Sequence, residues 1–211
     1  MQLSDFKVVR LTAPIFHTTD AEMAAFAERG LSVTVVDGEE PDNIIPHVAD
    51  ADIVTLIGTK LPTKVVEAMT RCRAIARMGA GTDKIDVARA TELGIVVANT
   101  PYFCVEEQAD HAMAMLLSLA RRLTQAQNGM AEGNLVRARS GVGSSQRIST
   151  TTLGLVGFGR SAVHMARRAR GFGMRVLATR RNRNAPTDEA DALGVEMTDL
   201  DTVLAESDFV S

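Results

Sequence analysis

The segment 153–181, LGLVGFGRSAVHMARRARGFGMRVLATRR, constrains the fold more than any other part of the sequence. An apolar run, a glycine-rich turn, helix formers and a second apolar run predict strand, turn, helix and strand. The turn reads G-x-G-x-x-A, which permits a tight bend, close approach of a pyrophosphate, and close packing of helix on strand. The motif in this context predicts a dinucleotide site, with a turn needed only for packing as the alternative. The expected contacts come from Gly157, Gly159, Arg160, Ser161 and Ala162.

The residues after the second strand bear on which dinucleotide is bound. In NAD sites an acid near this point bonds the ribose 2′-hydroxyl, whereas an arginine accommodates the 2′-phosphate of NADP. This strand is expected to end at Thr179, and no acid follows before Asp188. Because guanidinium groups pair with phosphate, Arg180 and Arg181 predict NADP(H), with NAD(H) as the alternative. The other interpretation of these arginines is ordinary loop charge.

Strand-like and helix-like segments alternate through the first hundred residues, which indicates a parallel α/β sheet with strands buried on both faces. The expected strands are 7–12, 31–36, 52–58, 74–79 and 95–100. The expected helices are 20–30, 62–71 and 84–93. Pro101 interrupts this rhythm, so we expect two α/β domains, residues 1–100 and 101–211.

A continuous apolar stripe at helical spacing predicts one long helix over 104–127. The segment 133–152 is rich in Gly, Ser and Arg and is expected to be an exposed connection. Within it, 140–145 (SGVGSS) is the candidate flexible loop.

Composition excludes some broad classes of function. A net charge of −3 implies no general attraction to nucleic acid or to an anionic membrane. The longest apolar stretch, 112–120, is too short to span a bilayer, and the N-terminus lacks a secretory signal, so the cytoplasm is the expected compartment. Cys72 and Cys104 lack metal or redox spacing and are expected to be small buried residues.

Four segments in order resemble the D-isomer-specific 2-hydroxyacid dehydrogenase family. They are the glycine-turn segment, RMGAGTDKIDVARATELGIVVANTP (77–101), VEEQADHAMAMLLSLARRL (105–123) and LDTVLAESDFVS (200–211). The middle segments look most like the phosphoglycerate-dehydrogenase and C-terminal-binding-protein branches. The Arg-Ser-x-Thr loop of phosphoglycerate dehydrogenases appears here as LIGT (56–59), which puts phosphoglycerate in doubt as the substrate.

The resemblance implies a flavodoxin-like substrate domain, followed by a Rossmann-type cofactor domain that is incomplete at its C-terminus. It implies that backbone amides of Gly79, Ala80 and Gly81 bind the substrate carboxylate, in keeping with the ability of a glycine turn to present amides to an anion. Gln108 stands near the expected nicotinamide position, where the family often has Val or Thr. The helix over 104–127 is expected to contribute to a homodimer.

For the intact protein, the resemblance implies hydride transfer between NADPH and a small 2-oxo or D-2-hydroxy acid. The family's catalytic Arg, Glu and His are expected beyond Ser211, so the 211 residues are interpreted as a fragment without turnover. A dinucleotide-binding co-regulator of C-terminal-binding-protein type is one alternative, and a degenerate remnant is another.

Overall fold

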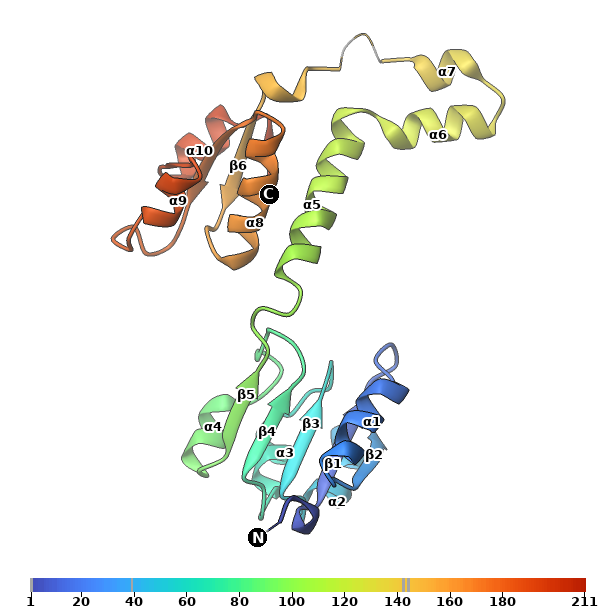
Figure 1. The fold of residues 1–211 in the computed structure, drawn as a ribbon, viewed down its shortest axis with the longest axis vertical. Coiled ribbons are helices and arrows are strands. Elements are labelled where there is room, and N and C mark those ends of the chain that lie inside the picture. The colour runs from blue at the N-terminus through green and yellow to red at the C-terminus, as the bar shows by residue number, and fades with distance from the viewer. Residues whose placement is uncertain (1, 39, 142, 144) are drawn as a thin grey trace. The chain divides into compact units, whose positions relative to one another are not determined.

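The computed structural model describes residues 2–38, 40–141, 143 and 145–211. These residues form two compact units that divide between Phe103 and Cys104, close to the boundary expected near residue 100. Each unit contains a parallel sheet with helices between its strands, so the α/β prediction is confirmed (Figure 1).

The first unit is built on a five-stranded parallel sheet in the order β2-β1-β3-β4-β5, the order of flavodoxin-like folds. Its strands are β1 (Val8–Thr12), β2 (Val33–Asp37), β3 (Ile53–Leu56), β4 (Ala74–Arg77) and β5 (Val96–Asn99). Its helices are α1 (Asp20–Glu28), α2 (Pro41–Val48), α3 (Thr63–Ala68) and α4 (Val87–Glu92), and a 3-10 helix, Leu3–Asp5, precedes β1.

The core of this unit lies between one face of the sheet and helices α2, α3 and α4. Residues along a strand alternate between faces, so Val9 and Leu11 of β1 join this core while Arg10 does not. Arg10 is buried against α1, where its Nε donates to Glu22 Oε1 at 2.5 Å. The expectation of strands buried on both faces is wrong for β2 and β5, which are the two edge strands and contain no buried residue.

The second unit has a parallel sheet in the order β8-β7-β6-β9. Numbered within the unit, this is 3-2-1-4, the first four positions of the Rossmann order. The strands are β6 (Thr152–Val156), β7 (Arg175–Thr179), β8 (Glu196–Met197) and β9 (Phe209–Val210). The helices are α5 (Val105–Ala120), α6 (Leu123–Ala131), α7 (Leu135–Arg139), α8 (Arg160–Gly171), α9 (Asp188–Ala192) and α10 (Leu200–Glu206).

The single helix expected over 104–127 is two helices. α5 ends at Ala120, and α6 begins at Leu123 after Arg122, whose φ of +53° is left-handed. A left-handed residue ends a helix because it turns the chain out of the helical path. The apolar stripe continues across the break, so its periodicity alone did not reveal it.

Part of the expected exposed connection over 133–152 is helical. Asn134 caps α7 by accepting a hydrogen bond from the Arg137 amide at 2.9 Å. Gly129 of α6 packs against Ala138 of α7, and a Cβ at Gly129 would lie 2.4 Å from the Ala138 nitrogen. The candidate flexible loop 140–145 includes residues 142 and 144, which lie outside the described residues.

Candidate functional site

The glycine turn after β6 leaves the first turn of α8 without a side-chain cap. Gly157 has a φ of +110°, a conformation that residues with side chains rarely adopt, and Gly159 is the N-cap of α8. The amides of Ser161 and Ala162 therefore have no acceptor among the described residues. These donors, at the positive end of a 12-residue helix, form a site suited to an anion.

The described structure gives no packing reason for a glycine at position 159. Its φ of −104° and ψ of −169° suit any residue, and an added Cβ would meet no atom within 4 Å. Gly154 of β6 differs, because a Cβ there would lie 2.3 Å from the Ser207 hydroxyl oxygen. Packing thus explains Gly154, whereas nothing in the described structure requires a glycine at position 159.

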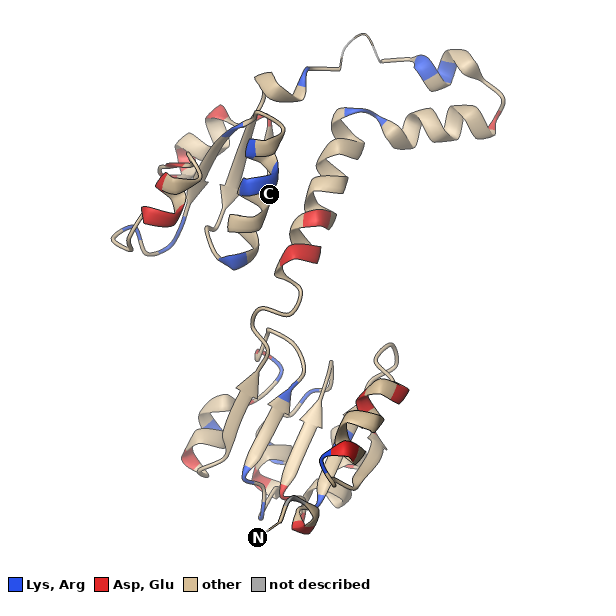
Figure 2. Cartoon of the chain, in the orientation of Figure 1, with Lys and Arg blue, Asp and Glu red and all other residues tan. Residues whose placement is uncertain are grey.

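Polar contacts tie α8 to α5. The Ser161 hydroxyl donates to Gln108 Oε1 at 2.5 Å, and Gln108 Nε2 donates to Cys104 Sγ at 3.3 Å. Arg168 Nε donates to Asp110 Oδ1 at 2.5 Å, and this bond raises the pKa of Arg168. Figure 2 shows the basic face of α8 beside the acidic start of α5. Gln108 thus contacts the glycine-turn helix, although the Ser161 hydroxyl is already used in that contact.

A cavity of about 240 Å³ opens where these two helices meet the end of β6. It is lined by Gln108, Ala109, Ala112, Leu155, Val156, Gly157, Ser161, Ala162, Met165 and Ser211. Most of the lining is apolar, and its polar side chains come from Gln108, Ser161 and Ser211. The cavity brings Gln108 together with the glycine turn, as a site shared by both requires.

The arginines after β7 differ in their surroundings. The Nη2 of half-buried Arg180 donates to the carbonyl oxygens of Ala185 and Pro186, the second at 2.9 Å. Its Nε is buried without a partner. Arg181 is exposed and makes no hydrogen bond or ion pair with the described residues. Arg180 therefore holds the loop after β7 in shape, while Arg181 is available to a ligand.

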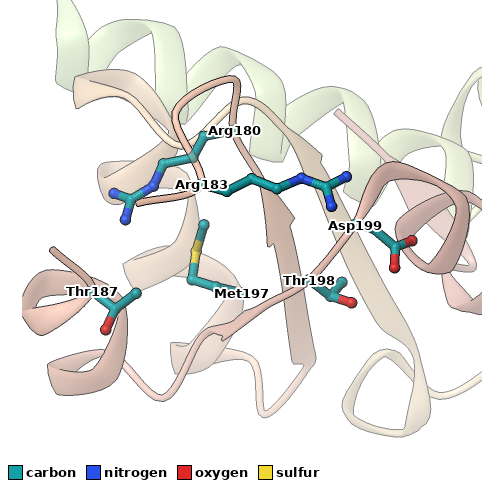
Figure 3. Close-up of a pocket in the computed structure, with 6 residues that line it drawn as sticks. All are labelled: Arg180, Arg183, Thr187, Met197, Thr198 and Asp199. Carbon is teal, nitrogen blue, oxygen red and sulfur yellow. The ribbon is translucent and has the colours of Figure 1, made fainter. Parts of the chain in front are cut away.

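Two cavities adjoin these arginines. One, of about 430 Å³, is lined by Val156, Gly157, Thr179, Arg180, Arg181, Arg183 and Leu200. The other, of about 320 Å³, is lined by Arg180, Arg183, Thr187, Met197, Thr198 and Asp199 (Figure 3). Figure 3 shows Arg183 extending toward Asp199. A hydrogen bond from the Thr202 amide, aided by the charge of Arg183, lowers the pKa of Asp199.

The first unit carries a second turn with free amides. The residues 79–81 follow β4 at the carboxyl edge of the sheet, and the amides of Ala80 and Gly81 have no acceptor among the described residues. Gly79 has a φ of +156°, and a Cβ there would lie 1.8 Å from Nη1 of Arg77. Only glycine fits this position, and the free amides can receive an anion.

Two side chains and one backbone amide outside this turn donate hydrogen bonds to its carbonyl groups. Arg77 donates through Nη1 to the carbonyl of residue 78 at 2.5 Å and through Nε to that of residue 81 at 3.1 Å. Asn99 Nδ2 donates to the carbonyl of residue 80 at 2.7 Å, and the Thr100 amide to that of residue 79 at 3.1 Å. The sequence analysis missed Arg77 and Asn99. The available signal was that both end neighbouring parallel strands, whose carboxyl ends share one edge of the sheet.

The remaining candidate groups are metal ligands and histidines. The described residues contain no group of His, Cys, Asp or Glu that could hold a metal ion. His111 is exposed, and His164 of α8 lies 3.8 Å from Glu106 through its Nδ1. No described helix combines the length and the apolar character needed to cross a membrane.

The fold and the two turns define a two-unit α/β protein with a dinucleotide-type turn in its second unit. The family model for the catalytic domain of D-isomer specific 2-hydroxyacid dehydrogenases matches residues 12–202. The chain belongs to the D-isomer-specific 2-hydroxyacid dehydrogenase family.

Similar proteins include a glyoxylate reductase of Korarchaeum cryptofilum, 41% identical over 170 residues that cover 80% of this chain and 51% of that protein. A D-3-phosphoglycerate dehydrogenase of Archaeoglobus fulgidus is 33% identical over 186 residues, covering 87% of this chain and 34% of that one. The solved D-lactate dehydrogenase of Aquifex aeolicus, complexed with NAD and lactic acid, shares the fold with a TM-score of 0.82 and 24% sequence identity. The match covers 96% of this chain and 59% of that one. This chain spans about half the length of the glyoxylate reductases that it matches.

Proposed function

We propose that this chain supplies the substrate-binding and cofactor-binding turns of an oxidoreductase. The reaction moves a hydride between NADP(H) and a small 2-oxo or D-2-hydroxy acid. The first unit is the substrate domain and the second is the cofactor domain. The observation that carries the proposal is Gly159, a glycine that the described structure does not need, at the open N-terminus of α8.

The second unit has the donors that a dinucleotide requires. Within the described part of the chain, the amides of Ser161 and Ala162 have no acceptor, and they suit a pyrophosphate. Gln108 lies beside them and fits the nicotinamide end. When bound, the nicotinamide donates or accepts the hydride, while these residues hold the cofactor in place.

The preference for NADPH over NADH rests on the end of β7. Arg181 is exposed and unpaired among the described residues, so a 2′-phosphate there would gain a charge-assisted hydrogen bond. Arg183 already faces the Asp199 carboxylate, which offsets part of its charge. Arg180 is occupied by two loop carbonyls. Arg181 is thus the expected main contact, with Arg180 shaping the loop that presents it.

An Arg181→Gln chain is expected to bind NADPH about tenfold more weakly than wild type and NADH unchanged, because only NADPH carries the 2′-phosphate. Fluorescence titration of each nucleotide into the 211-residue chain measures both affinities. Arg167→Gln, at an exposed arginine in the middle of α8, is the matched control and should change neither. Wild-type chain that binds NADH as tightly as NADPH would contradict the preference.

In the first unit, the free amides of Ala80 and Gly81 are the proposed site for the substrate carboxylate. The family's catalytic Arg, Glu and His have no counterpart assigned within residues 1–211, so we expect binding without turnover. The 211-residue chain should therefore not oxidise NADPH when given glyoxylate or hydroxypyruvate, followed by absorbance at the nicotinamide band. Steady, enzyme-dependent oxidation would refute this expectation and place the acid–base group within these residues.

We also propose a homodimer through the region 104–127. Several large apolar side chains on α5 and α6 are exposed by half or more: Met115, Leu119, Leu123 and Met130. Met115 and Leu119 lie four residues apart on one face of α5, and exposed apolar patches commonly mark protein–protein contacts. A second copy of the chain is the proposed partner.

A further inference from the structure

We propose that Arg77 and Asn99 are positioning residues, which aim the amides of the turn 79–81 at the substrate carboxylate. The inference rests on the proposed carboxylate site and adds the side chains that create it. Neither residue is proposed to react with the substrate. Their role is to hold the peptide carbonyls of the turn on one side, so that the amides face the other.

The planar peptide group links the direction of each carbonyl to that of the next amide. In a planar trans peptide, the carbonyl of one residue and the N–H of the next point in opposite directions. A donor that holds the Gly79 carbonyl therefore directs the Ala80 amide away from itself, and the Thr100 amide is that donor. In the same way, Asn99 Nδ2 holds the Ala80 carbonyl at 2.7 Å and directs the Gly81 amide.

Arg77 closes the turn at both ends. Its Nη1 holds the Met78 carbonyl at 2.5 Å and its Nε holds the Gly81 carbonyl at 3.1 Å. The second bond directs the Thr82 amide, which also has no acceptor among the described residues. Every carbonyl from 78 to 81 thus has a donor, while the amides from 80 to 82 have no acceptor among the residues that the structure describes.

Charge supports the same role. Arg77 is half-buried against the turn and makes no ion pair with the described residues. Asp83 lies close by, because a Cβ on Gly81 would be 2.7 Å from its Oδ1. The Arg77 guanidinium offsets this carboxylate, so the turn does not carry an unopposed negative charge that would repel an anion.

The shape of the guanidinium and its charge can be separated by substitution. Lysine keeps the charge of Arg77, but a single ammonium group lacks the planar fork that reaches two carbonyls at fixed geometry. Asn99→Ala removes one donor without changing charge. If the fork and the amide set the turn, both Arg77→Lys and Asn99→Ala weaken anion binding. If charge alone matters, Arg77→Lys does not.

The test is a titration of the isotope-labelled 211-residue chain with glycolate, an unreactive 2-hydroxy acid, followed by amide NMR. In wild type, the amides of Ala80, Gly81 and Thr82 should move together on titration. Arg77→Lys and Asn99→Ala should each lower glycolate affinity about tenfold. In Asn99→Ala, the Gly81 amide should lose most of its response, while Ala80, held through the Thr100 amide, keeps it. Arg73→Lys and Asn43→Ala, at exposed positions away from the turn, are matched controls and should bind as wild type does.

The outcomes separate this inference from the function on which it rests. If wild-type turn amides do not respond to glycolate, the proposed carboxylate site fails and the inference fails with it. If they respond but both variants bind glycolate as wild type does, only the positioning role is refuted.

A measurement on the unaltered chain covers the case in which a variant does not fold. The Arg77 Nε–H and the Asn99 side-chain amide protons should exchange slowly with solvent, because each is hydrogen-bonded. The Ala80 and Gly81 amide protons should exchange fast, because neither has an acceptor in the described structure. The reverse pattern would overturn the proposal.

Discussion

A Gly159→Asp chain is expected to bind NADPH about a hundredfold more weakly than wild type, yet to melt at the same or a higher temperature. Aspartate is a favoured N-cap, and its charge interacts well with the positive end of a helix, so α8 should gain stability. The same side chain would accept the hydrogen bonds of the free amides and repel a pyrophosphate. Stability and binding therefore move in opposite directions.

Nucleotide titration and thermal melting of the same samples measure both effects. Gly157→Ala is expected to lower both the NADPH affinity and the melting temperature, since alanine at a φ of +110° is strained. Gly171→Ala, at the last residue of α8, has open space around the new Cβ and should leave NADPH binding unchanged. A Gly159→Asp chain that binds NADPH as tightly as wild type would show that the pyrophosphate does not approach this turn.

Replacement of Glu22 by alanine is expected to lower the free energy of unfolding of the first unit by about 3–5 kcal/mol. The side chain of its partner Arg10 is only 2% exposed, and that of Glu22 is 17% exposed. Removing the carboxylate leaves a buried guanidinium whose remaining hydrogen-bond partner among the described residues is the Leu11 carbonyl. Burial of an unpaired charge is among the costliest changes a fold can suffer.

Thermal or denaturant unfolding measures the loss. Asp42→Ala is the matched control, because Asp42 and Lys64 form an ion pair at 2.7 Å with side chains 81% and 54% exposed. That substitution should cost at most about 1 kcal/mol. A double variant, Arg10→Met with Glu22→Leu, should recover much of the stability, since an apolar pair leaves no buried charge. Equal losses for Glu22→Ala and Asp42→Ala would contradict the role of burial.

Structure that depends on neighbouring residues was predicted from the sequence, whereas structure that depends on contacts between distant residues was not. The predicted strand, turn, helix and strand of 153–181 are present as β6, α8 and β7. The predicted helix over 104–127 failed at Arg122, where neither Gly nor Pro marks a break. The Arg122 guanidinium lies next to Gly141, since a Cβ on Gly141 would be 2.4 Å from its Nη1. Helical periodicity cannot reveal this contact, because the two residues lie far apart in the chain.

In the candidate sites, too, the sequence predicted residues but did not predict the contacts that they make. Gly157 of the glycine turn and the arginines after β7 line one cavity, although their binding roles stay predictions. The Nη2 of Arg180 bonds to two loop carbonyls, and the role of Arg180 toward a phosphate stays a prediction. The sequence did not predict these hydrogen bonds, because they depend on how the loop folds back.

The sequence by itself determined the strands of the first unit, the segment from β6 through α8 to β7, and the two glycine turns, because hydrophobic period and glycine conformation act over a few neighbouring residues. Only the tertiary structure decided what surrounds those turns. Asn99 reaches the Ala80 carbonyl because β4 and β5 pair in parallel, and Ser161 reaches Gln108 because α8 packs on α5. These hydrogen bonds join residues that are far apart in the chain, and strand pairing and helix packing alone bring their donors and acceptors within bonding distance.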